Sequence, residues 1–253
     1  MSEEPLPLQT RSARPLRPAS WLLALLAAGS LLRGLGGVGP AWGDAAASAA
    51  ADSGATALPS PSKAFGDHET GKALFESTCV PCHGANAEGN ADLGAPALNR
   101  QEPWYLLAQL RKFRGDLRGV KDDDIGGQMM APMAKSLADE QALLDVATYV
   151  SSLVGAPPAP TLRGDKAAGE RTFRGICTPC HGVNGVGRPE IRTPALIGQA
   201  DWYIASQLRK FRHGTRGYHE QDIAGMQMRG MATALPNDKA VVDVATYIAS
   251  LAK

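Results

Sequence analysis

The chain has 253 residues, which is enough for two small domains rather than one large one. Its 26 basic and 25 acidic residues leave a net charge of +1 at pH 7, which indicates neither a nucleic acid nor an anionic membrane as partner. Aromatic residues make up only 6% of the chain, and a core so poor in large side chains often includes a metal or a cofactor.

The first 43 residues are expected to be a signal peptide. Three arginines precede the twelve-residue apolar segment 21–32, which is well short of the ~20 residues that span a bilayer. Small residues at positions 41 and 43 predict cleavage before Asp44. An uncleaved anchor is the alternative, and association with the membrane surface stays open. In either case we expect the folded part in the periplasm.

The remainder divides into four segments by composition. Residues 44–64 are rich in Ala, Ser, Gly and Pro and predict a flexible lead-in. A first domain is expected at 65–154 and a second at 165–253. Between them, residues 155–164 read GAPPAPTLRG, a composition typical of a semi-rigid linker.

The two domains are internal repeats. At a fixed offset of 98 residues, without a gap, 38 positions are identical between 71–153 and 169–251. The shared segments include PAL, WY, QLRKFR and DVATY. Because the register is unbroken, we expect both copies to have the same fold, loops included.

Each copy predicts helices and no sheet. Gly71 and Phe75 belong to a segment with helical spacing that runs into the first cysteine, and Pro103 suits the first turn of a second helix. Ser136 with Asp139 three residues later resembles a capping box at the start of the last helix. The predicted fold is therefore two tandem all-α domains joined by the Pro-rich linker.

All four cysteines lie in two Cys-x-x-Cys-His segments, the attachment pattern of c-type haem. Two thiols three positions apart on a helical turn reach the two vinyl groups of one porphyrin edge, and the next histidine faces the iron. Disulfides would leave the histidines unexplained, zinc would need more ligands, and a thioredoxin-like pair needs a strand before the helix. The sequence thus indicates two covalently attached haem c groups, at Cys79, Cys82 and His83, and at Cys177, Cys180 and His181.

The second axial ligand of each iron is expected to be a methionine. Met130 and Met228 each follow the proximal histidine, His83 or His181, by 47 residues, on what we expect to be a loop before the last helix. A second matched pair lies three residues further on, so the spacing alone leaves two choices in each copy, the second being Met133 and Met231.

Other matched residues predict the surroundings of the haem. The backbone oxygens of Pro96 and Pro194, in the repeated PAL, are expected to accept from the proximal imidazoles. The WY pairs are expected in the core and the haem-pocket walls. The basic runs 111–114 and 209–212 suit either the haem propionates or a solvated helix end.

The combination of two Cys-x-x-Cys-His segments, PAL, QLRKFR, a distal Met-x-x-Met and a closing helix resembles the cytochrome c4 family. The resemblance implies two class I cytochrome c folds related by a pseudo-twofold axis, each with His/Met iron. It also implies that the first methionine of each pair is the ligand, which selects Met130 and Met228.

With both axial positions filled, we expect an electron carrier rather than an enzyme. The resemblance implies transfer between respiratory partners, such as a quinol-oxidising complex and a terminal oxidase. The alternative is the cytochrome subunit of a dehydrogenase complex, and a dihaem peroxidase is disfavoured because both copies keep their methionines.

The copies differ in charge, since 65–155 has 8 basic and 13 acidic residues (−5) and 163–253 has 13 and 8 (+5). Such asymmetry predicts oriented, salt-dependent docking.

Overall fold

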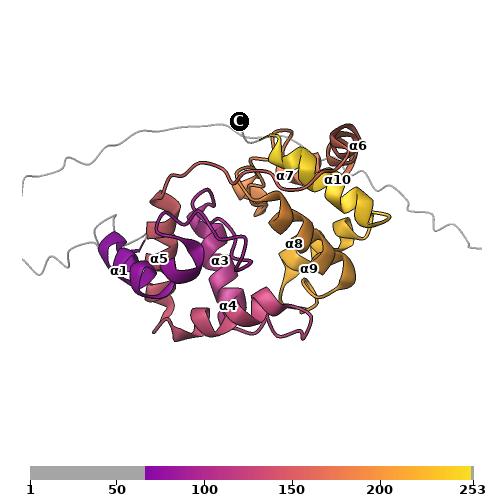
Figure 1. Ribbon diagram of the computed structural model, residues 1–253. Helices are drawn as coiled ribbons and strands as arrows, with labels where there is room; N and C mark the ends of the chain where they lie inside the picture. The colour runs from indigo at the N-terminus through magenta and orange to yellow at the C-terminus, as the bar shows by residue number, and fades with distance from the viewer. Residues whose placement is uncertain (1–65, 252–253) are drawn as a thin grey trace, which may run out of the picture. The chain divides into compact units, whose positions relative to one another are not determined.

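The computed structural model describes residues 66–251 (Figure 1). The expected signal peptide at 1–43 and the lead-in at 44–64 lie outside these residues. Within them, no helix combines the length and the hydropathy needed to cross a membrane. The described residues form helices and two isolated antiparallel bridges, Asn90–Ala95 and Arg188–Thr193, which confirms the all-α class.

The first domain contains five helices, drawn in indigo to magenta in Figure 1. Aspartate side chains accept from the first-turn backbone N–H groups of three of them, so local capping explains where they begin. The helices are α1 (His68–Thr78), α2 (Val80–His83), α3 (Pro103–Arg114), α4 (Ile125–Ser136) and α5 (Glu140–Ser152).

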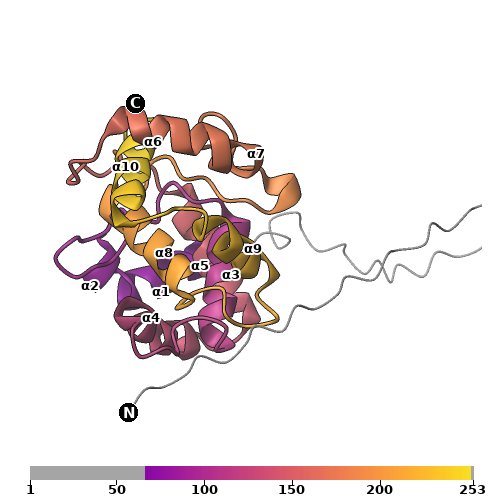
Figure 2. The same cartoon turned by 90° about the vertical axis from the view of Figure 1, so that its right-hand side faces the viewer.

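The second domain repeats this order. Its first long helix differs, because the stretch that leads into the motif forms a π-helical turn, Phe173–Cys177. As Figure 2 shows, α10 packs against α6 and α8. The helices are α6 (Lys166–Thr172), α7 (Thr178–His181), α8 (Asp201–His213), α9 (Ile223–Ala232) and α10 (Asp238–Ala249).

Two local expectations were wrong. Ser136 is the last residue of α4 and does not cap α5, because Asp139 accepts from the N–H of Ala142 and starts that helix. The methionines expected on a loop lie within α4 and α9. Each of these helices begins at a buried aspartate cap, and its Met, Gln and Ala residues have good helix propensity.

Each domain has a separate apolar core. In the first, Phe75 packs with Leu143, Val146 and Val150 of α5. In the second, Phe173 packs in the same way with α10. Since neither cluster includes residues of the other domain, the hydrophobic effect stabilises each domain through its own helices.

The first and last helices of each domain cross at a glycine. A Cβ at Gly71 would collide with the carbonyl oxygen of Asp145, and a Cβ at Gly169 would collide with that of Asp243. The carboxylates of the same aspartates accept from the backbone N–H groups just before α1 and α6. The repeated DVATY segment therefore anchors the start of each domain as well as its core.

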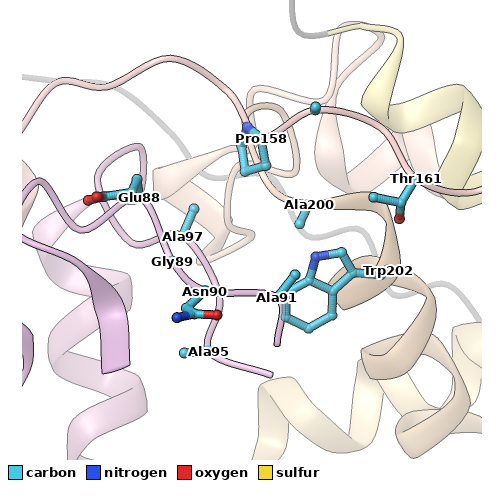
Figure 3. Close-up of a pocket in the computed structure, with 11 residues that line it drawn as sticks. Glu88, Gly89, Asn90, Ala91, Ala95, Ala97, Pro158, Thr161, Ala200 and Trp202 are labelled. Atoms are coloured by element: carbon cyan, nitrogen blue, oxygen red, sulfur yellow. The ribbon is translucent and has the colours of Figure 1, made fainter. Parts of the chain in front are cut away.

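The segment between α5 and α6 contains no helix, and the expected bounds 65–154, 155–164 and 165–253 stay predictions. The buried carboxylate of Asp201 accepts from the backbone N–H groups of Thr161 and Leu162, both at 2.7 Å. Beneath the linker lies a cavity of about 170 Å³. Figure 3 shows Trp202 of α8 lining it opposite the 88–97 loop, so this tryptophan contributes to the linker cavity.

Two glutamines make reciprocal contacts between the domains, as the expected pseudo-twofold requires. Nε2 of Gln101 donates to the carbonyl of Ala195 at 3.4 Å, and Nε2 of Gln199 donates to that of Ala97 at 2.8 Å. Both pairs keep the offset of 98 residues, with donor and acceptor exchanged between the domains.

Candidate haem sites

Each Cys-x-x-Cys-His segment spans a helix end and a following short helix. Cys79 ends α1, where its N–H donates to Phe75, and the N–H of His83 donates back to the Cys79 carbonyl at 2.9 Å. Pro81 stands in the first turn of α2, where its missing donor costs little. The four cysteines are unpaired, and the described residues gather no group of three His, Cys, Asp or Glu side chains such as a metal site of that kind would use.

The two histidines are buried and oriented by backbone carbonyls. Nδ1 of His83 lies 3.0 Å from the carbonyl oxygen of Pro96, and Nδ1 of His181 lies 2.9 Å from that of Pro194. A carbonyl oxygen only accepts, so each ring carries its proton on Nδ1 and leaves the Nε2 lone pair free. That tautomer is the one in which Nε2 can bind a metal.

Burial sets the protonation of these sites. It lowers the pKa of both His83 and His181, and the contact to the proline carbonyl only partly opposes this. The imidazoles are therefore neutral at pH 7. Burial also raises the pKa of the Cys79 and Cys177 thiols to about 11, so both are protonated at neutral pH.

A glycine-dependent loop brings each proline carbonyl to its histidine. The N–H of Gly89 donates to the His83 carbonyl at 2.8 Å, and φ at Gly89 is +85°. A Cβ at this position would lie 2.6 Å from the backbone N of Ala97, next to Pro96. The matched glycine, Gly187, has φ +80° and the same contact. Only glycine fits this close approach without strain.

Exposure separates the two candidate methionines in each copy. Met130 and Met228 are half-buried, whereas Met133 and Met231 are 43% and 42% exposed. Met130 packs against the cluster that includes Phe113, and Met228 packs against the core of the second domain. In both copies, therefore, the first methionine of the pair is the more buried one.

The basic runs at the ends of α3 and α8 are neither simply solvated nor free for propionates. Lys112 contacts Asp222 and Lys210 contacts Asp124, each across the domain boundary at 2.6 Å. The arginines of the runs bind groups within their own domain. Arg111 pairs with Glu140, Arg209 pairs with Asp238, and Arg114 and Arg212 donate to carbonyls.

Two other arginines meet at the centre of the boundary. Arg118 and Arg216 are both only 5% exposed, and both donate to the side-chain oxygens of Gln109 and Gln207. The hydroxyl of Tyr203 accepts from Arg118, and that of Tyr105 accepts from Arg216, so the tyrosines of the repeated WY lie at the boundary. None of these partners is a carboxylate.

This arrangement fits a haem. The Nε atoms of both arginines are buried without a partner, and a buried cation needs a counter-charge to offset its desolvation. The propionate carboxylates of a haem would supply it. The residues present thus offer thiols, a metal-binding nitrogen, a thioether and a cation in each domain.

The sequence alone indicated no such network for Arg118, Arg216, Gln109 or Gln207. All four are identical at the 98-residue offset, which is the one signal that could have identified them. That a charged side chain is buried is a property of tertiary packing, so the repeat alone does not predict it.

The family model for cytochrome c matches the chain twice, at residues 68–154 and 166–252. The cytochrome c4 of Stutzerimonas stutzeri is 36% identical over 197 residues, which cover 74% of this chain and 90% of that protein. The thiosulfate dehydrogenase electron acceptor of Stutzerimonas stutzeri (strain A1501) is 33% identical over 187 residues, covering 68% of this chain and 78% of that protein.

A solved structure shows the same architecture. The crystal structure of reduced recombinant cytochrome c4 from Pseudomonas stutzeri superposes with a TM-score of 0.58 at 33% sequence identity. The similarity covers 72% of this chain and 97% of that structure, so it extends over both domains.

Proposed function

The chain belongs to the cytochrome c4 family, and on this basis we propose that it carries electrons between two respiratory redox proteins of the periplasm. It is a dihaem electron-transfer cytochrome with two covalently attached haem c groups. Cys79, Cys82, Cys177 and Cys180 would hold the haems through thioether bonds. The haem iron supplies a one-electron couple when bound.

The observation that carries the proposal is the doubled arrangement of histidine and methionine. His83 and Met130 would be the axial ligands in the first domain, and His181 and Met228 in the second. The Pro96 and Pro194 carbonyls would hold the imidazoles in the metal-binding tautomer. With both axial positions filled by the protein, no position is left for a substrate, which favours electron transfer over catalysis.

The surroundings of each ligand support this role. The buried histidines stay neutral because their pKa values are lowered, so they remain available as ligands below neutral pH. Thioether ligation favours the reduced iron and raises the reduction potential. Arg118 and Arg216 place positive charge at the domain boundary, which acts in the same direction.

The partners are proposed from charge and similarity. A quinol-oxidising complex as donor and a terminal oxidase as acceptor suit a carrier whose two halves differ in net charge, −5 over 65–155 and +5 over 163–253. The second candidate function is the electron-accepting subunit of a dehydrogenase, because a similar protein is a thiosulfate dehydrogenase electron acceptor. Co-purification of a separate catalytic chain would favour this candidate.

The test uses the chain as expressed and exported. A pyridine haemochrome assay should give two haems per chain, and replacing Cys79 and Cys82 with alanine should leave one. Absorption spectra should show low-spin iron in both oxidation states. Met130→Ala and Met228→Ala should each convert one of the two haems from low-spin to high-spin. High-spin iron in the wild-type protein, or rapid peroxide turnover by the reduced protein, would contradict the proposal.

A further inference from the structure

Each methionine-bearing helix begins at a buried aspartate. Asp124 precedes α4, and its Oδ1 accepts from the N–H of Gly127 at 3.0 Å. Asp222 precedes α9, and its Oδ1 accepts from the N–H of Gly225 at 2.9 Å. The two aspartates are 0% and 2% exposed, so each helix start depends on a carboxylate that has left water.

The charge of each aspartate is neutralised from the other domain. Nζ of Lys210, on α8, lies 2.6 Å from the same Oδ1 of Asp124 that caps α4. Nζ of Lys112, on α3, lies 2.6 Å from Oδ1 of Asp222. One carboxylate oxygen therefore joins the helix cap of one domain to a lysine of the other, and the arrangement occurs twice with the domains exchanged.

The first turn of each helix has little freedom around this contact. A Cβ at Gly127 or Gly225 would collide with the capping carboxylate, so the backbone lies directly against it. The methionine follows three residues after the glycine, on the next turn of the helix. Losing the lysine would leave a buried, unpaired carboxylate, a strongly destabilising situation that the helix start can relieve by moving towards water.

We propose that each lysine positions the axial methionine of the opposite domain. Lys210 and Asp124 act on Met130, and Lys112 and Asp222 act on Met228. The inference rests on the proposed function, in which these methionines bind iron. Methionine ligation, and with it the reduction potential of each haem, would then depend on the domain that carries the other haem.

A crossed experiment tests this in the full-length dihaem protein. Met228→Ala leaves Met130 as the single source of the near-infrared charge-transfer band of ferric methionine-ligated haem. In that background Lys210→Met should diminish the band and lower the potential of the first haem, while Lys112→Met should leave the band unchanged. In the Met130→Ala background the roles of the two lysines should be exchanged.

Two further variants keep the test informative if Lys210→Met folds poorly. Asp124→Asn retains an oxygen that caps α4 but leaves the mostly buried ammonium of Lys210 without its counter-charge, and it should reproduce the loss at the first haem only. Lys210→Arg retains the charge and should restore the band. Haem content and circular dichroism would establish that each variant is folded.

The outcomes separate this inference from the proposed function. If the Met228→Ala parent lacks the band, Met130 is not a ligand and the proposed function fails at that point. If the parent has the band, an unchanged band and potential in both Lys210→Met and Asp124→Asn would overturn the inference. Equal losses from both lysine variants in one background would also overturn it, because that result indicates general weakening of the boundary.

Discussion

Arg118 donates from its guanidinium to the side-chain oxygen of Gln207 in the other domain, at 3.0 Å. The matched Arg216 donates to Gln109 at 2.8 Å, so the two domains exchange the same contact. Neither arginine pairs with a carboxylate among the residues described, and each guanidinium lies about 4.4 to 4.5 Å from the centre of a phenylalanine ring. A positive charge is thus held at the boundary by glutamine, tyrosine and phenylalanine side chains.

We expect Arg118→Leu to lower at least one of the two reduction potentials. Removing a buried positive charge favours the oxidised iron, which carries one charge more than the reduced iron. A redox titration followed by absorbance would measure the shift. Arg111→Leu is the control, because Arg111 is 55% exposed and pairs with Glu140, and it should leave both potentials unchanged. A rise in potential in Arg118→Leu would refute the expectation.

The helix crossing in the second domain should not tolerate a side chain at Gly169. An added Cβ would meet the backbone of Asp243, which cannot rotate away, so Gly169→Ala should lower the free energy of unfolding by ~1–3 kcal/mol. Gly230→Ala, in α9 of the same domain, meets nothing within 4 Å. It should leave stability unchanged or raise it by up to ~1 kcal/mol. Denaturant unfolding would measure the free energy of unfolding of both variants. A Gly169→Ala protein at least as stable as Gly230→Ala would contradict the prediction.

Acid should weaken the starts of α1 and α6. Backbone hydrogen bonds lower the pKa of the capping carboxylates of Asp67 and Asp165 below the ordinary 3.8. Because the folded pKa is the lower one, this stabilisation is fully present above pH 3.8 and is lost as pH falls through the folded pKa. Asp165→Asn caps without titrating, so it should match the parent at neutral pH and lose less stability in acid. The measurement is the melting temperature of the parent and of Asp165→Asn as a function of pH across that range. If both fell equally with pH, the cap would not be the source of the acid sensitivity.

Electron exchange with charged partners should depend on ionic strength. The net charge is −5 over 65–155 and +5 over 163–253, so a cationic partner should favour the first domain and an anionic partner the second. Stopped-flow rates with either partner should fall as salt rises, since exposed charges are screened beyond ~10 Å at 0.1 M ionic strength. A neutral small reductant is the control. If the rates with charged partners did not change with ionic strength, electrostatic steering would be excluded.

Much of this molecule is predictable because its sequence contains the same domain twice. The repeat at an offset of 98 residues predicted two domains of the same fold, and the Cys-x-x-Cys-His spacing predicted the haem groups. Local signals were weaker at element boundaries. Ser136 resembled a cap, but Asp139 starts the helix, because a helix start is decided by which side chain reaches the free N–H groups.

The sequence by itself determined the chemistry of the sites, since covalent spacing and residue type are local properties. The tertiary structure alone decided how the domains meet. It placed Lys112 against Asp222 and Lys210 against Asp124, and it buried Arg118 and Arg216 among glutamine and tyrosine side chains. In the sequence the two lysines suited either the haem propionates or a solvated helix end, and the two aspartates and two arginines had no assigned role. Their role follows from burial, because a charge withdrawn from water must find a partner wherever the fold provides one.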